Sequence, residues 1–593
     1  MSAAPSPAAT SALPFRFRPS PAVEAALSRL WRARAELFLA LFCAAQAVAM
    51  TRYAVREILP GPPLANDQIV YLHEVYEAAL IAARDGALAG LRTLVGGAPA
   101  AGIGLQLAAY GVTLVHGVGR LGPLLVNIAL FALVPGLLCL ILGRDKPFGL
   151  SLFLCGFWMS VQSMYGVMGG PFDFRLDFAA MALFAVACAL VWRTEAFTRP
   201  GWCLLAALAM AALCVTRTIM AAHLGVMAAV MAAGMLLQPK LRRHFHRPGG
   251  VQPLAGMLVT GIALAAAVGP YLALQWGNIW NYYVVGHVIG PEKDIRADMA
   301  GIHGLLDALA FYPRELLHNQ LGANAERLLV GILALAAALT AAGRLLGRRA
   351  PFAEVAPPVA RPRAAWALLV IAAALAGPFV TLNADVQKSW IVANVFVIGV
   401  GGLALFAFMA AAAALPRLTG PAAAAGLTLA VGAGAFAVGL RYEALILAQP
   451  SVVTRHADDF AARDRMLDLI AATAAANRWA TPNLFVDHIG DLDGLQMDLT
   501  HVERFGRELG VRRLLAQIFE VPEGELWPTL AAADFLILRA RPLPVGGGYP
   551  FDLQMQRLNA ELRAFARDRY RPLGAFRYFG TPLELYARVA GPG

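Results

Sequence analysis

The sequence predicts a mostly α-helical membrane protein, a polytopic bundle of about eleven spans followed by a C-terminal soluble α/β domain. Apolar residues make up 59% of the 593 residues and the mean hydropathy is +0.60, above what soluble globular proteins show. Apolar runs of about 20 residues, the length that crosses a bilayer, recur up to residue 440. After residue 441 the hydrophobicity falls, and helix and strand patterns alternate, with predicted helices at 458–477 and 551–569 and predicted strands at 483–487, 534–540 and 582–589.

Composition divides the chain into three parts. Residues 1–35 are rich in Ala, Pro and Ser, and are predicted to be a partly disordered cytoplasmic leader. Residues 36–440 form the predicted transmembrane domain, with a large outer loop at 56–120, and residues 441–593 form the soluble domain. The predicted spans are 36–55, 121–142, 147–166, 176–192, 201–216, 220–238, 253–275, 325–343, 364–382, 389–413 and 421–440.

The distribution of charge predicts the topology. The chain carries 49 Lys and Arg against 38 Asp and Glu, and the excess lies in the membrane part, because residues 451–593 hold 17 basic and 18 acidic residues. Basic loops are typical of the cytoplasmic side, so the N-terminus is predicted inside and the C-terminal domain outside. A further apolar stretch at 99–119 is predicted to be an interfacial or re-entrant helix, because a crossing there would break this alternation. The positive charge therefore reports topology, and no nucleic-acid partner is predicted.

The segment after the first span is too polar to cross a bilayer, yet it has a helical pattern. Three prolines end the preceding helix, and Asn66 or Asp67 stands where a helix N-cap is expected. Apolar residues from Ile69 onward then recur at helical spacing, with Glu74 on another face. This pattern predicts a helix along the membrane interface that holds Asp67 at the mouth of the membrane domain. Asp67 acting only as an N-cap is the alternative interpretation.

Two further charged groups interrupt apolar segments on the same predicted side. Asp173 and Asp177 bracket Arg175 in GGPFDFRLDF, at the start of a span. Arg217 in CVTRTIM interrupts an otherwise apolar run. Ionisable groups at this depth are costly and usually face a cavity or a partner. The alternatives are an interfacial ion cluster that anchors a helix end, and a tight turn marked by Arg217.

A third group of charged side chains lies in the outer loop at 281–298, which contains His287, Lys293 and Arg296. A carboxylate can deprotonate a hydroxyl acceptor, and cations can stabilise a departing phosphate. Arginine matches phosphate through two parallel hydrogen bonds, and lysine meets it as a point charge. Each of these three residues is by itself also typical of a solvated loop.

Together these features resemble the integral-membrane, C-type (GT-C) glycosyltransferases, which include protein O-mannosyltransferases, the aminoarabinose transferase of lipid A and the oligosaccharyltransferases. The resemblance covers residues 36–300: a first span, a long outer loop that opens with an aspartate, GVGRLGPLLVN at 117–127, DFRLDF and CVTR. It implies a glycosyltransferase of a bacterial-type inner membrane that works on the periplasmic side. The donor would be a polyprenyl-phosphate sugar, and the acceptor a glycan, lipid or protein hydroxyl, with inversion at the anomeric carbon.

The resemblance also implies roles for the charged residues. Asp67 would be the general base, and Asp173 and Asp177 would orient the acceptor or hold a divalent cation. Mg²⁺ or Mn²⁺ is expected if a metal is used, with Asp67, Glu74 and Asp173 as its candidate ligands. The donor phosphate would be bound by Arg217, His287, Lys293 and Arg296. The alternatives are a non-catalytic envelope-assembly membrane protein or a transporter with a transferase-like fold.

Overall fold

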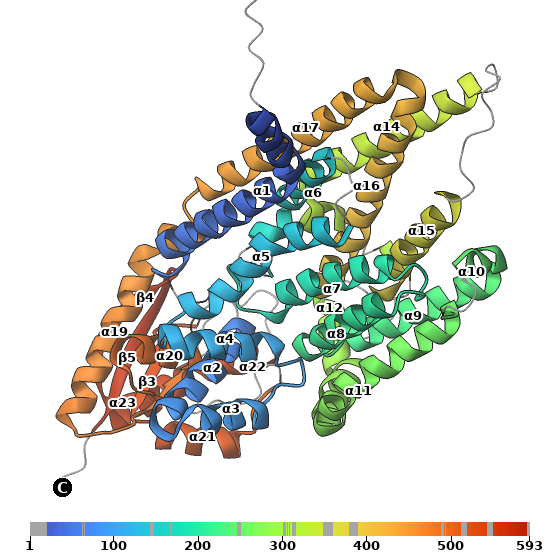
Figure 1. Ribbon diagram of the computed structural model, residues 1–593. Helices are drawn as coiled ribbons and strands as arrows, with labels where there is room; N and C mark the ends of the chain where they lie inside the picture. Colours follow the sequence, from blue (N-terminus) through green and yellow to red (C-terminus); the bar gives the residue numbers. More distant parts are fainter. Residues whose placement is uncertain are drawn as a thin grey trace, which may run out of the picture.

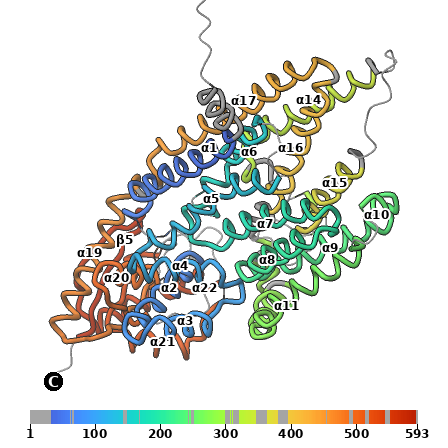
Figure 2. The backbone as a smooth tube through the Cα atoms, in the orientation of Figure 1, coloured from blue at the N-terminus to red at the C-terminus, as the bar shows by residue number. Residues whose placement is uncertain are grey.

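The computed structural model shows a helical bundle joined to an α/β domain, with α17 (Pro421–Leu447) running along the bundle toward that domain (Figure 1). The predicted boundary at residue 440 falls inside this helix. The outer helices α2 (Asn66–Asp85), α3 (Ala87–Gly96) and α4 (Gly104–His116) lie beside the α/β domain at the same end (Figure 2). The structure describes residues 21–61, 63, 66–142, 148–166, 169–245, 251–300, 304, 306–307, 309–310, 316–347, 360–378, 389–487, 492, 494–511, 519–542 and 550–589.

The bundle begins with α1, which starts at Pro21, so the predicted leader is helical from that residue; the rest of the leader lies outside the described residues. Its Ala, Leu, Glu and Arg residues favour a helix. The elements are α1 (Pro21–Tyr53), η1 (Ala54–Ile58), α5 (Leu121–Leu142), α6 (Phe148–Ser160), η2 (Gln162–Tyr165), α7 (Leu176–Arg193), α8 (Pro200–Thr216), α9 (Met220–Leu237), α10 (Pro239–Phe245), α11 (Pro253–Ile279), η3 (Trp280–Ile289), α12 (Glu292–Ala300), η4 (Leu316–Leu321), α14 (Gly322–Gly347), α15 (Ala360–Ala376) and α16 (Ser389–Thr419).

Among the described residues, eight helices are long and apolar enough to cross a membrane. The other three predicted spans lie on the apolar helices α6, α8 and α15, which have 13, 17 and 17 residues. The multi-pass membrane fold is thus confirmed, whereas the count of eleven stays a prediction. The stretch at 99–119 contains α4, whose 13 residues extend about 20 Å and are too short to cross a hydrocarbon core of about 30 Å.

Helices α6 and α17 pack closely because small residues face each other. A Cβ atom added at Gly149 would lie 2.4 Å from the carbonyl oxygen of Thr428, and one added at Gly156 would lie 2.4 Å from that of Ala435. From the other side, a Cβ on Gly439 would meet the carbonyl oxygen of Gly156 at 2.3 Å. Small residues allow such close approach, which drives helix association in lipid.

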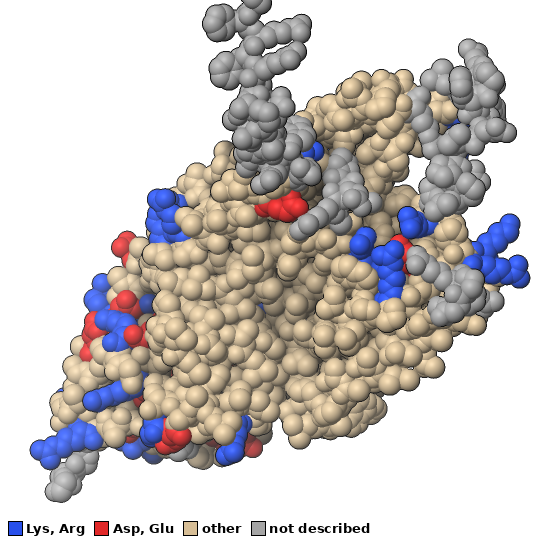
Figure 3. Space-filling model, viewed as in Figure 1, with Lys and Arg blue, Asp and Glu red and all other residues tan. Residues whose placement is uncertain are grey.

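Charged side chains are distributed unevenly over the surface. On the face in Figure 3 they gather on the C-terminal domain and at the opposite end of the bundle, with a broad band between them that is almost free of charge. Such a band suits a bilayer, because charged groups are expensive in hydrocarbon. The arrangement agrees with a membrane domain that has aqueous surfaces at two ends.

The C-terminal domain is the predicted α/β domain, with a five-stranded mixed sheet in the order β2-β1-β3-β5-β4. Strand β1 pairs in parallel with β2 and β3, and β5 pairs antiparallel with β3 and β4. Apolar residues of α19 cover one face, and those of α21, α22 and α23 cover the other. The elements are α18 (Val452–Arg455), α19 (Ala457–Ala476), β1 (Asn483–Val486), α20 (Gly494–Phe505), β2 (Gly510–Val511), α21 (Glu523–Ala532), β3 (Phe535–Arg539), α22 (Pro550–Arg557), α23 (Asn559–Arg569), β4 (Tyr570–Tyr578) and β5 (Thr581–Arg588).

One ion pair between this domain and α2 involves a buried carboxylate. Asp498 on α20 lies with Oδ2 3.2 Å from Nδ1 of His73, and its side chain is 2% exposed. Its Oδ1 accepts a hydrogen bond from the backbone N–H of Leu509. The pKa of Asp498 is raised to about 7, mainly by burial and in part by the nearby carboxylates of Glu508 and Glu77. The folded protein therefore binds this proton more tightly than the unfolded chain does.

The raised pKa of Asp498 predicts a loss of stability as the pH rises. The stabilisation is fully present below the ordinary pKa of an aspartate and is lost as the pH rises through about 7. We expect the wild type to melt at a lower temperature at pH 8.5 than at pH 6, and Asp498→Asn to show a smaller difference. The amide still accepts the N–H of Leu509 but carries no charge. Melting curves of both proteins at the two pH values test this, and an identical shift in both would contradict it.

Candidate active site

Helix α2 places Asp67 in its first turn. The helix begins at Asn66, so Asp67 is its second residue rather than the cap that precedes it. A carboxylate at this position is favoured by the partial positive charge of the helix N-terminus. The Asp67 side chain is exposed, and none of the described residues forms a hydrogen bond or an ion pair with it. The Asp67 carboxylate is therefore open to solvent at the start of α2.

The loop that enters α7 buries a second carboxylate. Asp173 is fully buried, and its Oδ2 accepts hydrogen bonds from the N–H of Gly169 at 2.6 Å and from Nε of Arg175 at 2.5 Å. Two side chains hold the loop backbone: Asn127 on α5 donates to the carbonyl oxygen of Asp173 at 2.8 Å, and Gln68 on α2 donates to that of Phe172 at 3.4 Å. Gln68 thus ties the helix that carries Asp67 directly to this loop.

Arg217 lies in the turn between α8 and α9, and is buried beside Asp177. Its Nη2 is 3.4 Å from Oδ1 of Asp177, and each side chain is 6% exposed. The loop before α4 fixes the turn, because the N–H of Thr218 donates to the carbonyl oxygen of Ala101 at 2.8 Å. Gly102 is required there: its φ is +135°, and a Cβ atom would lie 2.2 Å from the carbonyl oxygen of Thr216. Arg217 therefore marks a turn and also faces the acidic loop.

Tyr71 brings these groups into one site. It follows Asp67 by one helical turn on α2, is 6% exposed, and lies within electrostatic range of Asp67, Asp177 and Arg217. Arg175 similarly lies within range of Asp67 and Asp177. The structure thus gathers two carboxylates and the Arg217 guanidinium around Tyr71, and Arg175 lies near the same two carboxylates.

Polar atoms in this site have unused hydrogen-bonding capacity. The described residues provide no hydrogen-bond partner for Oδ1 of Asp173, Nη2 of Arg175 or Nε of Arg217. Leaving buried polar atoms without a partner is costly, and at functional sites the partner is often water or a ligand. The site is therefore equipped to hold a polar group between its acids and its arginines.

Comparisons with known proteins identify the fold. No family model and no curated protein sequence matches the chain. Among solved structures, it is similar to ArnT from Cupriavidus metallidurans in the apo state, with a TM-score of 0.53 and 12% identity over 94% of this chain and 100% of that chain. The same protein bound to undecaprenyl phosphate gives a TM-score of 0.53 and 12% identity over 94% and 99%. The chain has the GT-C fold.

An oligosaccharyltransferase from Archaeoglobus fulgidus shows a weaker likeness to this GT-C chain, with a TM-score of 0.45 and 11% identity over 95% of this chain and 74% of that chain. Both neighbours are glycosyltransferases. The similarity to ArnT confirms, at the level of the fold, the resemblance expected from the sequence.

Within the GT-C fold, the phosphate-binding residues predicted from the sequence are only partly described. Arg217 is buried in the site, and Tyr282 and Tyr283 of η3 lie within electrostatic range of it. Lys293 is exposed on α12, with no described ion pair to the site. The side chains of His287 and Arg296 lie outside the described residues. Sequence reasoning missed Tyr71 as a site residue, although its position one turn after Asp67 was a usable signal.

The carboxylates expected to hold a metal are not gathered into one cluster among the described residues of this GT-C site. Glu74 accepts a hydrogen bond from Nε2 of Gln106 on α4 at 3.2 Å, and Oδ2 of Asp173 is occupied by Gly169 and Arg175. Among the described residues, no group of three His, Cys, Asp or Glu side chains is placed to hold an ion. The dependence on Mg²⁺ or Mn²⁺ stays a prediction. The reaction proposed below includes no step that uses a metal ion.

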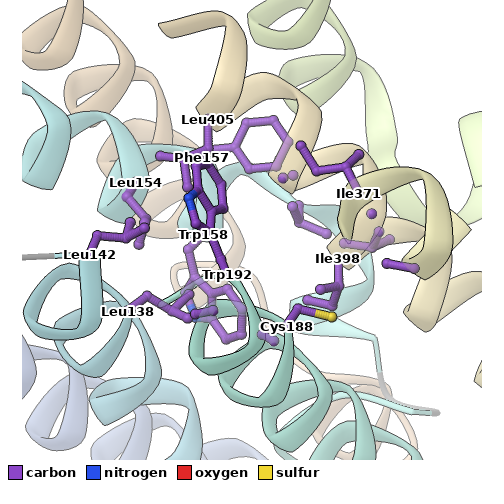
Figure 4. Close-up of a pocket in the computed structure, with 18 of the residues that line it drawn as sticks. Leu138, Leu142, Leu154, Phe157, Trp158, Cys188, Trp192, Ile371, Ile398 and Leu405 are labelled. Atoms are coloured by element: carbon purple, nitrogen blue, oxygen red, sulfur yellow. The ribbon is translucent and has the colours of Figure 1, made fainter. Parts of the chain in front are cut away.

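An apolar cavity of about 110 Å³ lies deeper in the GT-C bundle, between α5, α6, α7, α15 and α16 (Figure 4). Trp158 and Trp192 line it, together with Cys188. Cys188 follows Asp177 by 11 residues on α7, so the cavity wall lies about 17 Å further along that helix. The cavity is suited to hydrocarbon.

Proposed function

We propose that this chain is a membrane glycosyltransferase that moves a sugar from a polyprenyl-phosphate donor to a hydroxyl group of a glycan, lipid or protein acceptor. The observation that carries the proposal is the convergence of Asp67, Asp177 and Arg217 around Tyr71, at the end of a GT-C bundle that lies next to the C-terminal domain. The structure of ArnT bound to undecaprenyl phosphate supports a lipid phosphate as the donor carrier.

In the proposed reaction, the Asp67 carboxylate takes the proton of the acceptor hydroxyl. The acceptor oxygen then attacks the anomeric carbon from the side opposite the phosphate, and a new glycosidic bond forms with inversion. The bond between the anomeric carbon and the phosphate oxygen breaks, and its electron pair leaves with the polyprenyl phosphate. A general base must be within reach of the proton and must be free to accept it, as the exposed carboxylate of Asp67 is.

The arginines supply charge at the leaving group. The guanidinium of Arg217 donates hydrogen bonds to the phosphate, and Asp177 orients that guanidinium. Asp173 holds Arg175 in the same way. The roles expected for Asp173 and Asp177, to orient the acceptor or to hold a divalent cation, stay predictions. His287, Lys293 and Arg296 remain proposed phosphate contacts of the outer loop. The lipid chain of the donor lies in the bilayer, and the apolar cavity beneath the site takes part of its length.

An assay with purified protein tests this function. The protein in detergent is incubated with a panel of polyprenyl-phosphate sugars, and release of polyprenyl phosphate and transfer to added acceptors are both measured. Transfer with at least one donor that is lost in Asp67→Asn supports the proposal. No transfer across a broad panel of donors and acceptors, with folded protein, contradicts it and favours a non-catalytic role.

The proposal also requires a defined orientation in a bacterial inner membrane: a cytoplasmic N-terminus and a periplasmic C-terminal domain. A reporter enzyme that is active only in the periplasm, fused after Gly593, is expected to be active. The same reporter fused within the basic segment 239–250 is expected to be inactive, since that segment is predicted to be cytoplasmic. An inactive C-terminal fusion would place Asp67 on the wrong side for a periplasmic reaction.

A further inference from the structure

Helix α20 of the C-terminal domain contacts the helix that carries Asp67, although about 430 positions separate the two in sequence. Figures 1 and 2 show α20 next to the outer helices α2 and α4. The hydroxyl of Tyr76 donates a hydrogen bond to Oε1 of Glu503 at 2.8 Å, and Nε2 of Gln496 donates to the carbonyl oxygen of Pro63 at 3.2 Å. With the pair between His73 and Asp498, α20 touches α2 and the segment that leads into it.

Glu503 also connects α20 to the membrane bundle. Its Oε1 lies 3.1 Å from Nε of Arg120, which precedes α5 and is 9% exposed. The same guanidinium donates through Nη2 to the carbonyl oxygen of Leu59 at 2.6 Å, at the end of the first span. One carboxylate of the soluble domain therefore binds both α2 and a cation that is fixed to the bundle.

The apolar contacts lead from α20 directly to the site. Leu499 and Val502 belong to the same buried cluster as Tyr71 of α2 and as Phe174 and Leu176 of the acidic loop. Buried clusters are close-packed, so a displacement of one helix is transmitted to the helices and loops packed against it. The position of α20 is thus coupled to the position of both α2 and the loop of Asp173.

We propose that α20 is a positioning element for catalysis, which holds α2 so that Asp67 keeps its distance from the acidic loop and from Arg217. Tyr76 and Glu503 are positioning residues: they touch no substrate and act through α2. The inference rests on the proposed function in that Asp67 is the base. It predicts that loosening α20 lowers turnover but leaves donor binding intact, because Glu503 bonds to Tyr76 and Arg120 rather than to Arg217.

Two neighbouring residues on α20 provide a matched test. Glu503→Ala removes the bonds to Tyr76 and Arg120. Arg504→Ala removes a neighbouring, more exposed charge whose partners, Asp464 and Asp468, lie on α19 within the same domain. Tyr76→Phe removes only the hydroxyl and keeps the ring packed. It is the second, milder variant, and it tests the same bond if Glu503→Ala does not fold.

Three measurements are made on the full-length protein: amide hydrogen exchange of α2, kcat, and the Kd for polyprenyl phosphate alone. We expect faster exchange across residues 67–76 and a kcat lower by about 10- to 100-fold in Glu503→Ala, with a smaller change of the same kind in Tyr76→Phe. The Kd should be unchanged in both, and Arg504→Ala should match the wild type in all three measurements.

The outcomes separate this inference from the proposed function. Unchanged exchange and unchanged kcat in Glu503→Ala and Tyr76→Phe overturn it, as does a loss of donor affinity equal to the loss of kcat. If no donor supports turnover in the wild type, the proposed function fails. The exchange comparison between Glu503→Ala and Arg504→Ala still decides whether α20 holds α2.

Discussion

Asp67→Asn is expected to lower turnover by about 100- to 10,000-fold, the range expected for loss of a general base. The side chain is nearly isosteric, and the carboxylate has no hydrogen bond or ion pair to lose among the described residues. An amide cannot take the proton of the acceptor hydroxyl. Removing the charge from the first turn of α2 costs only about 0.3–1 kcal/mol of helix stabilisation. The protein should therefore fold normally and bind the donor with unchanged affinity.

Asp85→Asn is the matched control for Asp67→Asn. Asp85 is the last residue of the same helix, is exposed, and pairs only with its neighbour Arg84 at 2.8 Å among the described residues. Initial rates and donor affinities of wild type and both variants are compared under identical conditions. Near-normal turnover in Asp67→Asn would show that the carboxylate serves the helix N-terminus rather than the reaction.

Substitution of Arg217 is expected to weaken donor binding in a graded way. Arg217→Lys keeps the charge but loses the planar fork that matches phosphate, and should bind polyprenyl phosphate about tenfold more weakly. Arg217→Ala removes the charge as well, and should weaken binding by about 100-fold or more, since a hydrogen bond between charged groups contributes about 1.5–3 kcal/mol. Binding of polyprenyl phosphate to the three proteins in detergent gives the comparison.

Arg217→Ala also leaves Asp177 buried without its partner, which alone destabilises a protein by about 3–5 kcal/mol. The double variant Arg217→Ala, Asp177→Asn removes that uncompensated charge and should recover stability without recovering affinity. Arg199→Lys, at a partly exposed arginine that pairs with Glu195, is the control for a general effect of the substitution. Equal affinities of wild type, Arg217→Lys and Arg217→Ala would assign Arg217 to the turn alone.

The secondary structure was predictable where local pattern and environment agree. Strands β1, β3 and β5 lie within the predicted ranges 483–487, 534–540 and, but for one residue, 582–589, because β1 and β3 are short apolar runs and β5 alternates Leu583, Glu584 and Leu585. Strand β4 was missed: it contains Pro572 and Gly574 and a register irregularity between them, which an edge strand tolerates but which hides the pattern. The predicted helix at 551–569 is divided at Leu558 into α22 and α23.

The composition of the chain determined that most of it is a membrane bundle. The positions of charged residues indicated Asp67, Asp173, Asp177 and Arg217, because ionisable groups beside apolar spans are too costly to be incidental. Only the tertiary structure decided how they pair. Asp173 faces Arg175, Asp177 faces Arg217, and Tyr71 lies among them.

The tertiary structure alone also decided that the soluble domain reaches the site. The bond between Tyr76 and Glu503 joins residues 427 positions apart. Helical periodicity shows which face of each helix is apolar, but it carries no information on which distant face will cover it. That choice is made by the packing of the whole chain, in which the buried carboxylates of α20 are stable only because α2 and the bundle supply their partners.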